Sequence, residues 1–142
     1  MKFNFLCLVG VSVFSTAVIA ENVPRGSLVV RYGAANTDEN YAKEDGYPDG
    51  KMQSISAVCS PGNEAVSEVN VKNLIRSDKG HPSADRLGKA GATNASSLIG
   101  AGATVVKDPI KSKNPNHCLI NNIKLKDIKG VWTIFADPIK SP

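Results

Sequence analysis

The stretch SISAVCSPGNEAV, residues 54–66, sets the terms for interpreting the rest of the sequence. Small polar and apolar side chains alternate from Ser54 to Ala57, which is the period-2 pattern of a β-strand with one buried face. A cysteine ends this pattern, and a Pro-Gly-Asn sequence typical of a turn follows it. The stretch therefore predicts a strand that ends near Cys59, and it raises the question of which cysteine Cys59 pairs with.

An apolar segment opens the chain. Residues 1–20 contain one lysine near the start, a mostly apolar run of 15 residues from Phe5 to Ile19, and small side chains up to Ala20. This three-part pattern is typical of a secretory signal peptide, and the run is shorter than the roughly 20 residues that a bilayer span needs. We therefore expect a secreted protein without a membrane span, in which residues 21–142 form a single small domain with one core.

Cleavage of a signal peptide would change the number of cysteines. The chain has three cysteines, and Cys7 would leave with residues 1–20, so that Cys59 and Cys118 remain. An even number of cysteines in an exported chain favours a disulfide bond. Closing a loop of this length is worth on the order of 4 kcal/mol in the chain-entropy model. We therefore expect Cys59 to form a disulfide bond with Cys118.

The charged side chains are distributed unevenly. Residues 21–50 carry six acidic and three basic side chains, whereas residues 107–142 carry seven lysines and three aspartates. Scattered lysines usually form a solvated face, which is the expectation here. Two alternatives stay open: the acidic and basic ends face each other, or the basic end meets an anionic surface. The lysines at 107–129 have no aromatic side chains among them, so a nucleic-acid partner is not expected.

Short β-branched runs separated by glycine and proline predict a mainly β, β-rich α+β fold in a small barrel. The expected strands are residues 27–32, 51–59, 65–71, 103–108, 117–125 and 130–137. The expected irregular segments are a loose leader at 21–27 and a long acidic loop at 33–51. A short helical turn is expected after residue 71, and Ser83 is expected to cap a short helix that the following glycines limit.

The sequence offers little for metal or cofactor chemistry. Only His81 and His117 are present, no thiol remains beside the expected disulfide, and a zinc site takes three or four ligands. We expect no metal and no cofactor, and we expect the protein to be non-enzymatic. One enzymatic alternative stays open, a secreted ribonuclease-like toxin in which His117 would act with Glu64 and Arg86 as acid–base and phosphate-stabilising groups.

Binding of a sugar would need an aromatic platform and planar hydrogen-bonding side chains. Tyr32, Tyr41, Tyr47 and Trp132 are the candidate platforms, although the apolar neighbours of Trp132 favour a place for it in the core. Asn94 begins an Asn-Ala-Ser sequence, the acceptor pattern for N-glycosylation, which predicts an exposed and glycosylated segment in a eukaryotic secreted protein.

Several short motifs resemble the cerato-platanin family of small secreted fungal proteins. Val30-Arg31-Tyr32 and the segment from Val58 to Asn63 are similar to a Val-x-Tyr strand and a Val-x-Cys-Ser-x-Gly-x-Asn strand end in that family. The later matching positions are Ile99-Gly100, Asn116, Cys118 and Asp137. The family usually carries four cysteines, whereas the part of this chain after residue 20 carries two.

The resemblance implies a double-psi β-barrel, a fold shared with barwin-like and expansin-related domains. It implies a secreted effector, elicitor or virulence protein that binds chitin-type wall polysaccharides, and it makes Tyr32 and Asp137 the expected ligand-binding residues. Together with the composition, it predicts a monomeric, non-enzymatic secreted protein whose partner is a cell-wall glycan or a host protein.

Overall fold

The structure is a computed structural model that describes residue 10, residues 20–80 and residues 88–139. The strands are β1 (Ser27–Tyr32), β2 (Lys51–Met52), β3 (Ile55–Asn63), β4 (Lys89–Asn94), β5 (Thr104–Lys107), β6 (His117–Asn121), β7 (Ile123–Lys124) and β8 (Thr133–Ala136). The helices are the 3-10 helix η1 (Asp38–Tyr41) and the α-helices α1 (Glu68–Ser77), α2 (Ala95–Gly100) and α3 (Leu125–Lys129). The leader expected over residues 1–20 lies almost wholly outside the described residues.

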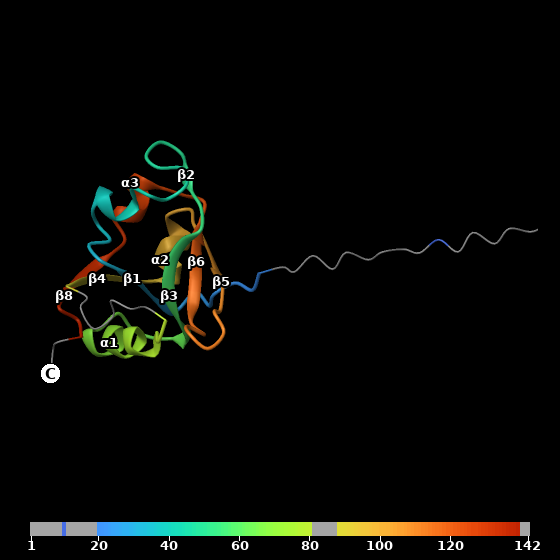
Figure 1. Ribbon diagram of the computed structural model, residues 1–142. Coiled ribbons are helices and arrows are strands. Elements are labelled where there is room, and N and C mark those ends of the chain that lie inside the picture. Colours follow the sequence, from blue (N-terminus) through green and yellow to red (C-terminus); the bar gives the residue numbers. More distant parts are fainter. Residues whose placement is uncertain (1–9, 11–19, 81–87, 140–142) are drawn as a thin grey trace, which may run out of the picture.

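Six of these strands form one antiparallel sheet in the order β5-β6-β3-β1-β4-β8, and β2 pairs with β7 separately (Figure 1). The predicted mainly β fold is confirmed. The expected barrel is not confirmed. Within the described ranges, β5 and β8 are the two edges of the sheet and do not pair with each other. Helices bury the apolar faces of the sheet, so the sheet does not need to close on itself to form its core.

Strand β1 is one of the two central strands of the sheet and is buried on both faces. Leu28 and Val30 pack on one face with the apolar side of α1, whereas Val29 packs on the other face with Leu98 of α2. All three β1 side chains are fully buried. A strand that is covered on both faces has a continuous apolar sequence, and the Leu-Val-Val sequence therefore predicted this strand clearly. Figure 1 shows α1 beneath the sheet, with α3 and β2 above it.

Helix α1 replaces the strand that was expected over residues 65–71. Ser67 caps the helix, because its hydroxyl accepts a hydrogen bond from the backbone N–H of Asn70. Val71, Leu74 and Ile75 are the buried residues of the helix, and their spacing places them on one helical face. The alternation around Val69 suggested a strand, but Val69 is exposed to solvent. The strand prediction is therefore wrong, and the helical period of the buried residues is the reason.

Strand β3 continues through the Ser-Pro-Gly-Asn sequence that was expected to turn. The register against β1 passes from Val29↔Cys59 to Ser27↔Asn63, so a β-bulge lies between these pairs. A bulge accommodates proline because its residues need not donate to the ladder. The side chain of Ser60 restores the missing bond: its hydroxyl accepts from the N–H of Leu28 at 2.8 Å and donates to the carbonyl of Gly62 at 2.7 Å.

Replacement of Ser60 by alanine is expected to lower the free energy of unfolding by about 2 kcal/mol. The substitution leaves the N–H of Leu28 buried without its acceptor, and an unsatisfied buried donor costs about 1–3 kcal/mol. Denaturant unfolding of the wild-type and variant proteins measures this loss. The exposed Ser97→Ala variant is the control and is expected to stay within about 0.5 kcal/mol of the wild type. Equal stabilities of Ser60→Ala and wild type would contradict this role for the hydroxyl.

The predicted disulfide is confirmed. Cys59 and Cys118 are bonded, with their Cα atoms 5.9 Å apart, and both side chains are buried. The bond joins β3 to β6, which also pair through Ala57↔Cys118 and Val58↔His117. His117 therefore begins a strand that is fixed both by the ladder and by the covalent bond beside it.

Strand β4 occupies a segment where no strand was expected. Ala90 and Ala92 are buried on the face that carries α1, and Gly91 faces the other way. A Cβ atom on Gly91 would lie 2.5 Å from the Cβ of Ala35, so only glycine fits at this close approach. Small residues have low strand propensity, which hid this strand in the sequence. The helix start expected at Ser83 lies outside the described residues.

The two segments expected to be irregular are attached to the domain. Residues 21–27 were expected to be loose, but Val23 is buried, donates to the carbonyl of Val105 at 3.0 Å and precedes a strand that starts at Ser27. The free edge of β5 offers the hydrogen-bonding groups that hold this segment. The acidic segment 33–51 contains η1, in which Tyr41 is fully buried and donates to the carbonyl of Ala35.

Two exposed ion pairs join the acidic start of the domain to its basic end, which is one of the alternatives that the charge distribution left open. Lys107 pairs with Glu21 at 3.0 Å, and Lys129 of α3 pairs with Asp38 of η1. Both contacts are exposed, so each contributes little to stability. Among residues 20–80 and 88–139, none of the helices has the length and apolar character of a membrane-spanning helix.

Candidate functional site

The candidate site lies where β1 and β3 diverge. The register between these strands ends at the pair Val30↔Val58. Beyond this pair, β1 stays with β4 through Arg31↔Gly91 and Tyr32↔Ala90, whereas β3 stays with β6. A fork between two neighbouring strands leaves space that no strand fills.

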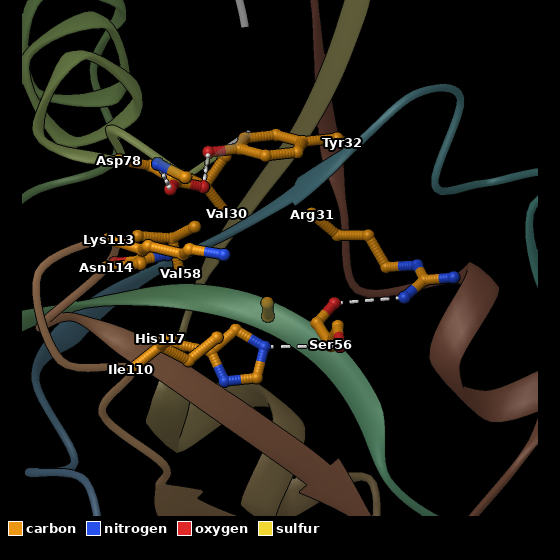
Figure 2. A pocket seen from close by; sticks show the side chains of 12 residues that line it. Val30, Arg31, Tyr32, Ser56, Val58, Asp78, Ile110, Lys113, Asn114 and His117 are labelled. Atoms are coloured by element: carbon orange, nitrogen blue, oxygen red, sulfur yellow. Dashed lines mark hydrogen bonds between the residues drawn. The ribbon is translucent and has the colours of Figure 1, made fainter. Parts of the chain in front are cut away.

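A pocket of about 380 Å³ opens at this fork (Figure 2). That volume is within the range of about 300–1,000 Å³ that is usual for small-molecule sites. The apolar side chains that line it are Val30, Ala57, Val58 and Ile110. The polar side chains that line it are Arg31, Tyr32, Ser56, Asp78, Lys113, Asn114 and His117. The combination of apolar walls with a few convergent polar groups is typical of a binding site.

Two loops form the walls of the pocket and are bonded to each other. Asp78 ends α1, and the turn 110–114 connects β5 to β6. Lys79 donates its backbone N–H to the carbonyl of Lys113 at 2.9 Å, and the amide of Asn116 donates to the hydroxyl of Ser77 at 3.3 Å. These bonds keep the two walls at a fixed separation, so the pocket is preformed.

Tyr32 and Asp78 form a hydrogen-bonded pair in the pocket. The phenol of Tyr32 donates to Oδ2 of Asp78 at 2.8 Å, while Oδ1 accepts from the N–H of Gly80 at 3.0 Å. Burial raises the pKa of Tyr32 well above its usual value, and the hydrogen bond to the Asp78 carboxylate raises it further. The phenol therefore stays neutral at physiological pH, and its ring presents a fixed surface.

His117 links three neighbouring strands of the sheet. Its Nε2 lies 3.2 Å from Oγ of Ser56 on β3, and its Nδ1 lies 3.0 Å from both the backbone O and Oδ2 of Asp108, just after β5. Figure 2 shows the imidazole edge turned toward Ser56. The His117 side chain is 14% exposed, so the ring is held in place while one edge stays accessible from the pocket.

Arg31 closes the pocket at the side of the acidic segment. Its guanidinium donates to the carbonyl of Ser56 at 2.9 Å and to the side-chain and backbone oxygens of Asn40, and it pairs with Glu44 at 2.9 Å. The guanidinium also lies over the ring of Tyr41, 4.8 Å from its centroid. These contacts use the guanidinium to hold residues 33–51 against β3, so Arg31 has a mainly structural role.

The structure brings together two residues that the sequence suggested for different reasons. Tyr32, expected as a ligand-binding residue, and His117, expected as the centre of an acid–base alternative, line the same pocket. Asp137 is exposed beyond β8 and is not among the lining residues. Glu64 follows the far end of β3 and is not a lining residue either. Arg86 and His81 lie outside the described residues, so the ribonuclease-like alternative stays a prediction.

Arg31 stood only inside the Val-x-Tyr match, and four further polar residues of the pocket were missed in the sequence: Ser56, Asp78, Lys113 and Asn114. None of them belongs to a motif with a recognisable spacing. Only the position of Ser56 was visible in advance, since it alternates with the buried residues Ile55 and Ala57 and must therefore face the opposite side of the strand. Asp78, Lys113 and Asn114 come from loops whose positions depend on the packing of the whole domain.

Asn94 precedes the first residue of α2, makes no capping hydrogen bond with its side chain and is half-buried. Its side-chain nitrogen donates to the carbonyl of Glu64 at 3.0 Å and to that of Gly26 at 3.3 Å. N-glycosylation would use this same nitrogen, so a glycan at Asn94 would displace at least one of these bonds. Glycosylation at this position stays a prediction.

In the described parts of the chain, no group of three or more histidine, cysteine or carboxylate side chains is placed to hold a metal ion. The chain matches no family model, no curated protein and no solved structure.

Proposed function

We propose that this protein is a secreted binding protein of effector or elicitor type, and that the pocket at the β1–β3 fork takes one sugar unit of a cell-wall or host-surface glycan. The proposal rests above all on the convergence of an aromatic ring, a carboxylate and further polar groups in one preformed pocket. Such groups can donate to and accept from sugar hydroxyls, while an aromatic ring supports the apolar face of a sugar ring.

The polar groups of the pocket suit a neutral, hydroxyl-rich ligand. Asp78 can accept from a hydroxyl, and Lys113 can donate to one. Because Arg31 is paired with Glu44, the other charged side chains of the lining are one cation, Lys113, and one carboxylate, Asp78. A ligand with a large net charge would meet repulsion from one of these two. The apolar walls around Val30 and Val58 then exclude water from the bound face of the ligand.

Different observations support the secretion and the glycan class in this proposal. The leader pattern at 1–20 predicts export, and a disulfide suits an oxidising compartment. The resemblance to cerato-platanins suggests a chitin-type polysaccharide. The described sheet provides only the coarser feature, an antiparallel β-fold with one disulfide.

Replacement of Tyr32 by alanine is expected to weaken binding of N-acetylglucosamine oligosaccharides by about tenfold or more, because an aromatic contact in a buried pocket commonly contributes more than about 1 kcal/mol. Isothermal titration of the disulfide-bonded protein with soluble chitin and cellulose oligosaccharides measures this loss. Lys113→Ala provides a second test that leaves the Tyr32–Asp78 bond in place.

Two matched controls distinguish the pocket from the rest of the surface. Tyr47→Ala removes an exposed tyrosine outside the pocket, and Lys126→Ala removes an exposed lysine on α3. Both controls are expected to bind as the wild type does. Absence of oligosaccharide binding by the wild-type protein would reject the glycan part, and equal losses in Tyr32→Ala and Tyr47→Ala would reject the pocket.

A further inference from the structure

We propose that Ser56 is a nucleophile, that His117 is its general base and that Asp108 orients the imidazole, so that the pocket can cleave short acyl esters. The inference goes beyond glycan binding, since it adds a reaction and does not require that a sugar be bound. It rests on the geometry of three side chains that lie in a row across the sheet, on β3, on β6 and just after β5.

The tautomer of His117 follows from its two contacts. Nδ1 faces only oxygens of Asp108, the carbonyl and the carboxylate, and both are acceptors. The ring hydrogen of the neutral imidazole therefore lies on Nδ1, and Nε2 carries the lone pair. The hydroxyl of Ser56, 3.2 Å away, then donates to Nε2. A hydroxyl, a base and a group that orients the base are the parts of an activated serine.

The backbone holds these three groups in place. The register Ser56↔Leu119 and Val58↔His117 fixes β3 against β6, and the N–H of Asp108 donates to the carbonyl of His117 at 2.9 Å. The disulfide lies directly after His117. Groups that are mounted on paired strands keep their separation better than groups on free loops.

The reaction follows from these positions. Oγ of Ser56 forms a bond to the carbonyl carbon of the ester while its proton moves to Nε2 of His117. The tetrahedral intermediate expels the alcohol, which takes that proton and leaves an acyl group on Oγ. A water molecule then attacks the acyl carbon and gives a proton to Nε2, and Oγ leaves with that proton as the carboxylic acid is released.

The surroundings of Ser56 suit a small acyl group. Ser56 is exposed to the pocket, and the nearby lining residues Ala57, Val58 and Ile110 are apolar. Lys113 lines the same pocket, and its positive charge can stabilise the oxyanion that forms during attack. Figure 2 shows Lys113 beside Asn114, and His117 with its ring beside Ser56.

The test measures covalent modification and turnover in the disulfide-bonded chain. Phenylmethylsulfonyl fluoride, which sulfonylates activated serines, is expected to add once, at Ser56, as located by peptide mass mapping. Hydrolysis of p-nitrophenyl acetate is expected to fall by about 100-fold or more in Ser56→Ala and His117→Gln, the size typical of a lost nucleophile or base. Ser97→Ala, which removes an exposed serine on α2, is the matched control and is expected to retain the wild-type rate.

Asp108 is a positioning residue and needs a separate readout. Asp108→Asn is expected to slow sulfonylation of Ser56 by about tenfold, less than loss of the base, because the backbone carbonyl of residue 108 still accepts from Nδ1. Asp108→Glu is expected to restore part of the rate, which a purely structural contact would not require. Circular dichroism of each variant confirms that it is folded. Equal modification of Ser56 and Ser97, or wild-type hydrolysis by folded Ser56→Ala, would overturn the proposal, and neither result would bear on glycan binding.

Discussion

Replacement of both Cys59 and Cys118 by alanine is expected to lower the free energy of unfolding by about 4 kcal/mol. The bond spans a sequence separation of 59, and the chain-entropy model assigns this magnitude to a loop of that length. Small domains have a total stability of about 5–15 kcal/mol, so the loss is a large fraction of the total. Denaturant unfolding of the oxidised wild type and the double alanine variant measures it.

Reduced wild-type protein is the control for this prediction. It lacks the covalent bond but retains both sulfur atoms, so the difference between it and the double alanine variant reports packing alone. A loss below about 1 kcal/mol in the double variant would contradict the expected role of the bond. Because His117 directly precedes Cys118, the same variant is also expected to loosen the contact between His117 and Ser56.

Replacement of Arg31 by methionine is expected to lower the free energy of unfolding by about 3 kcal/mol. The Arg31 side chain is 11% exposed, and its guanidinium donates hydrogen bonds to Asn40, Glu44 and the carbonyl of Ser56. Removal of one partner of a buried pair leaves the other charge and the buried acceptors unsatisfied, which costs about 3–5 kcal/mol. The 22% exposure of the Glu44 side chain moderates that cost, so the lower end of the range is expected.

Glu44→Gln is the matched control for Arg31→Met. Glutamine retains an oxygen that can accept from the guanidinium, so the loss is expected to be about 1 kcal/mol. Denaturant midpoints at equal slope measure both changes. Equal losses in the two variants would mean that the Arg31–Glu44 charge pair alone, and not the whole set of contacts, holds the acidic segment in place.

The sequence was most informative where burial was continuous or chemistry was simple. Strand β1 was predicted at residues 27–32 as observed, because its apolar run is covered on both faces. The disulfide followed from the count of cysteines left after removal of a leader. Strand β5 was also marked by its β-branched residues, although it is two residues shorter than expected.

The sequence was misleading where tertiary contacts override local preference. The Pro-Gly pair in β3 looked like a turn because nothing local shows that the hydroxyl of Ser60 replaces a ladder bond. Strand β4 is rich in alanine and glycine, and its position depends on close packing against Ala35 and Trp132. Such effects involve residues distant in the chain and leave no periodic pattern.

The sequence indicated only some of the residues that line the pocket. Tyr32 and His117 were proposed separately, and only the divergence of β1 from β3 places them in one pocket. Asp137 was suggested by resemblance alone, and the structure places it beyond β8 and outside the pocket lining. The contact of Ser56 with His117 depends on strand register, which a single sequence does not specify when two apolar runs of similar length can pair in several ways.

Nuclear magnetic resonance titration is the most direct test of the binding pocket. The ¹⁵N-labelled, disulfide-bonded chain is titrated with N-acetylglucosamine oligosaccharides while the backbone amide signals are followed. Saturable shifts are predicted for Tyr32, Asp78, Asn114 and His117, with the amide of the control residue Tyr47 unchanged. Absence of saturable shifts at the four pocket residues, or shifts centred on Tyr47 and the acidic segment 33–51, would contradict a glycan-binding pocket at the β1–β3 fork.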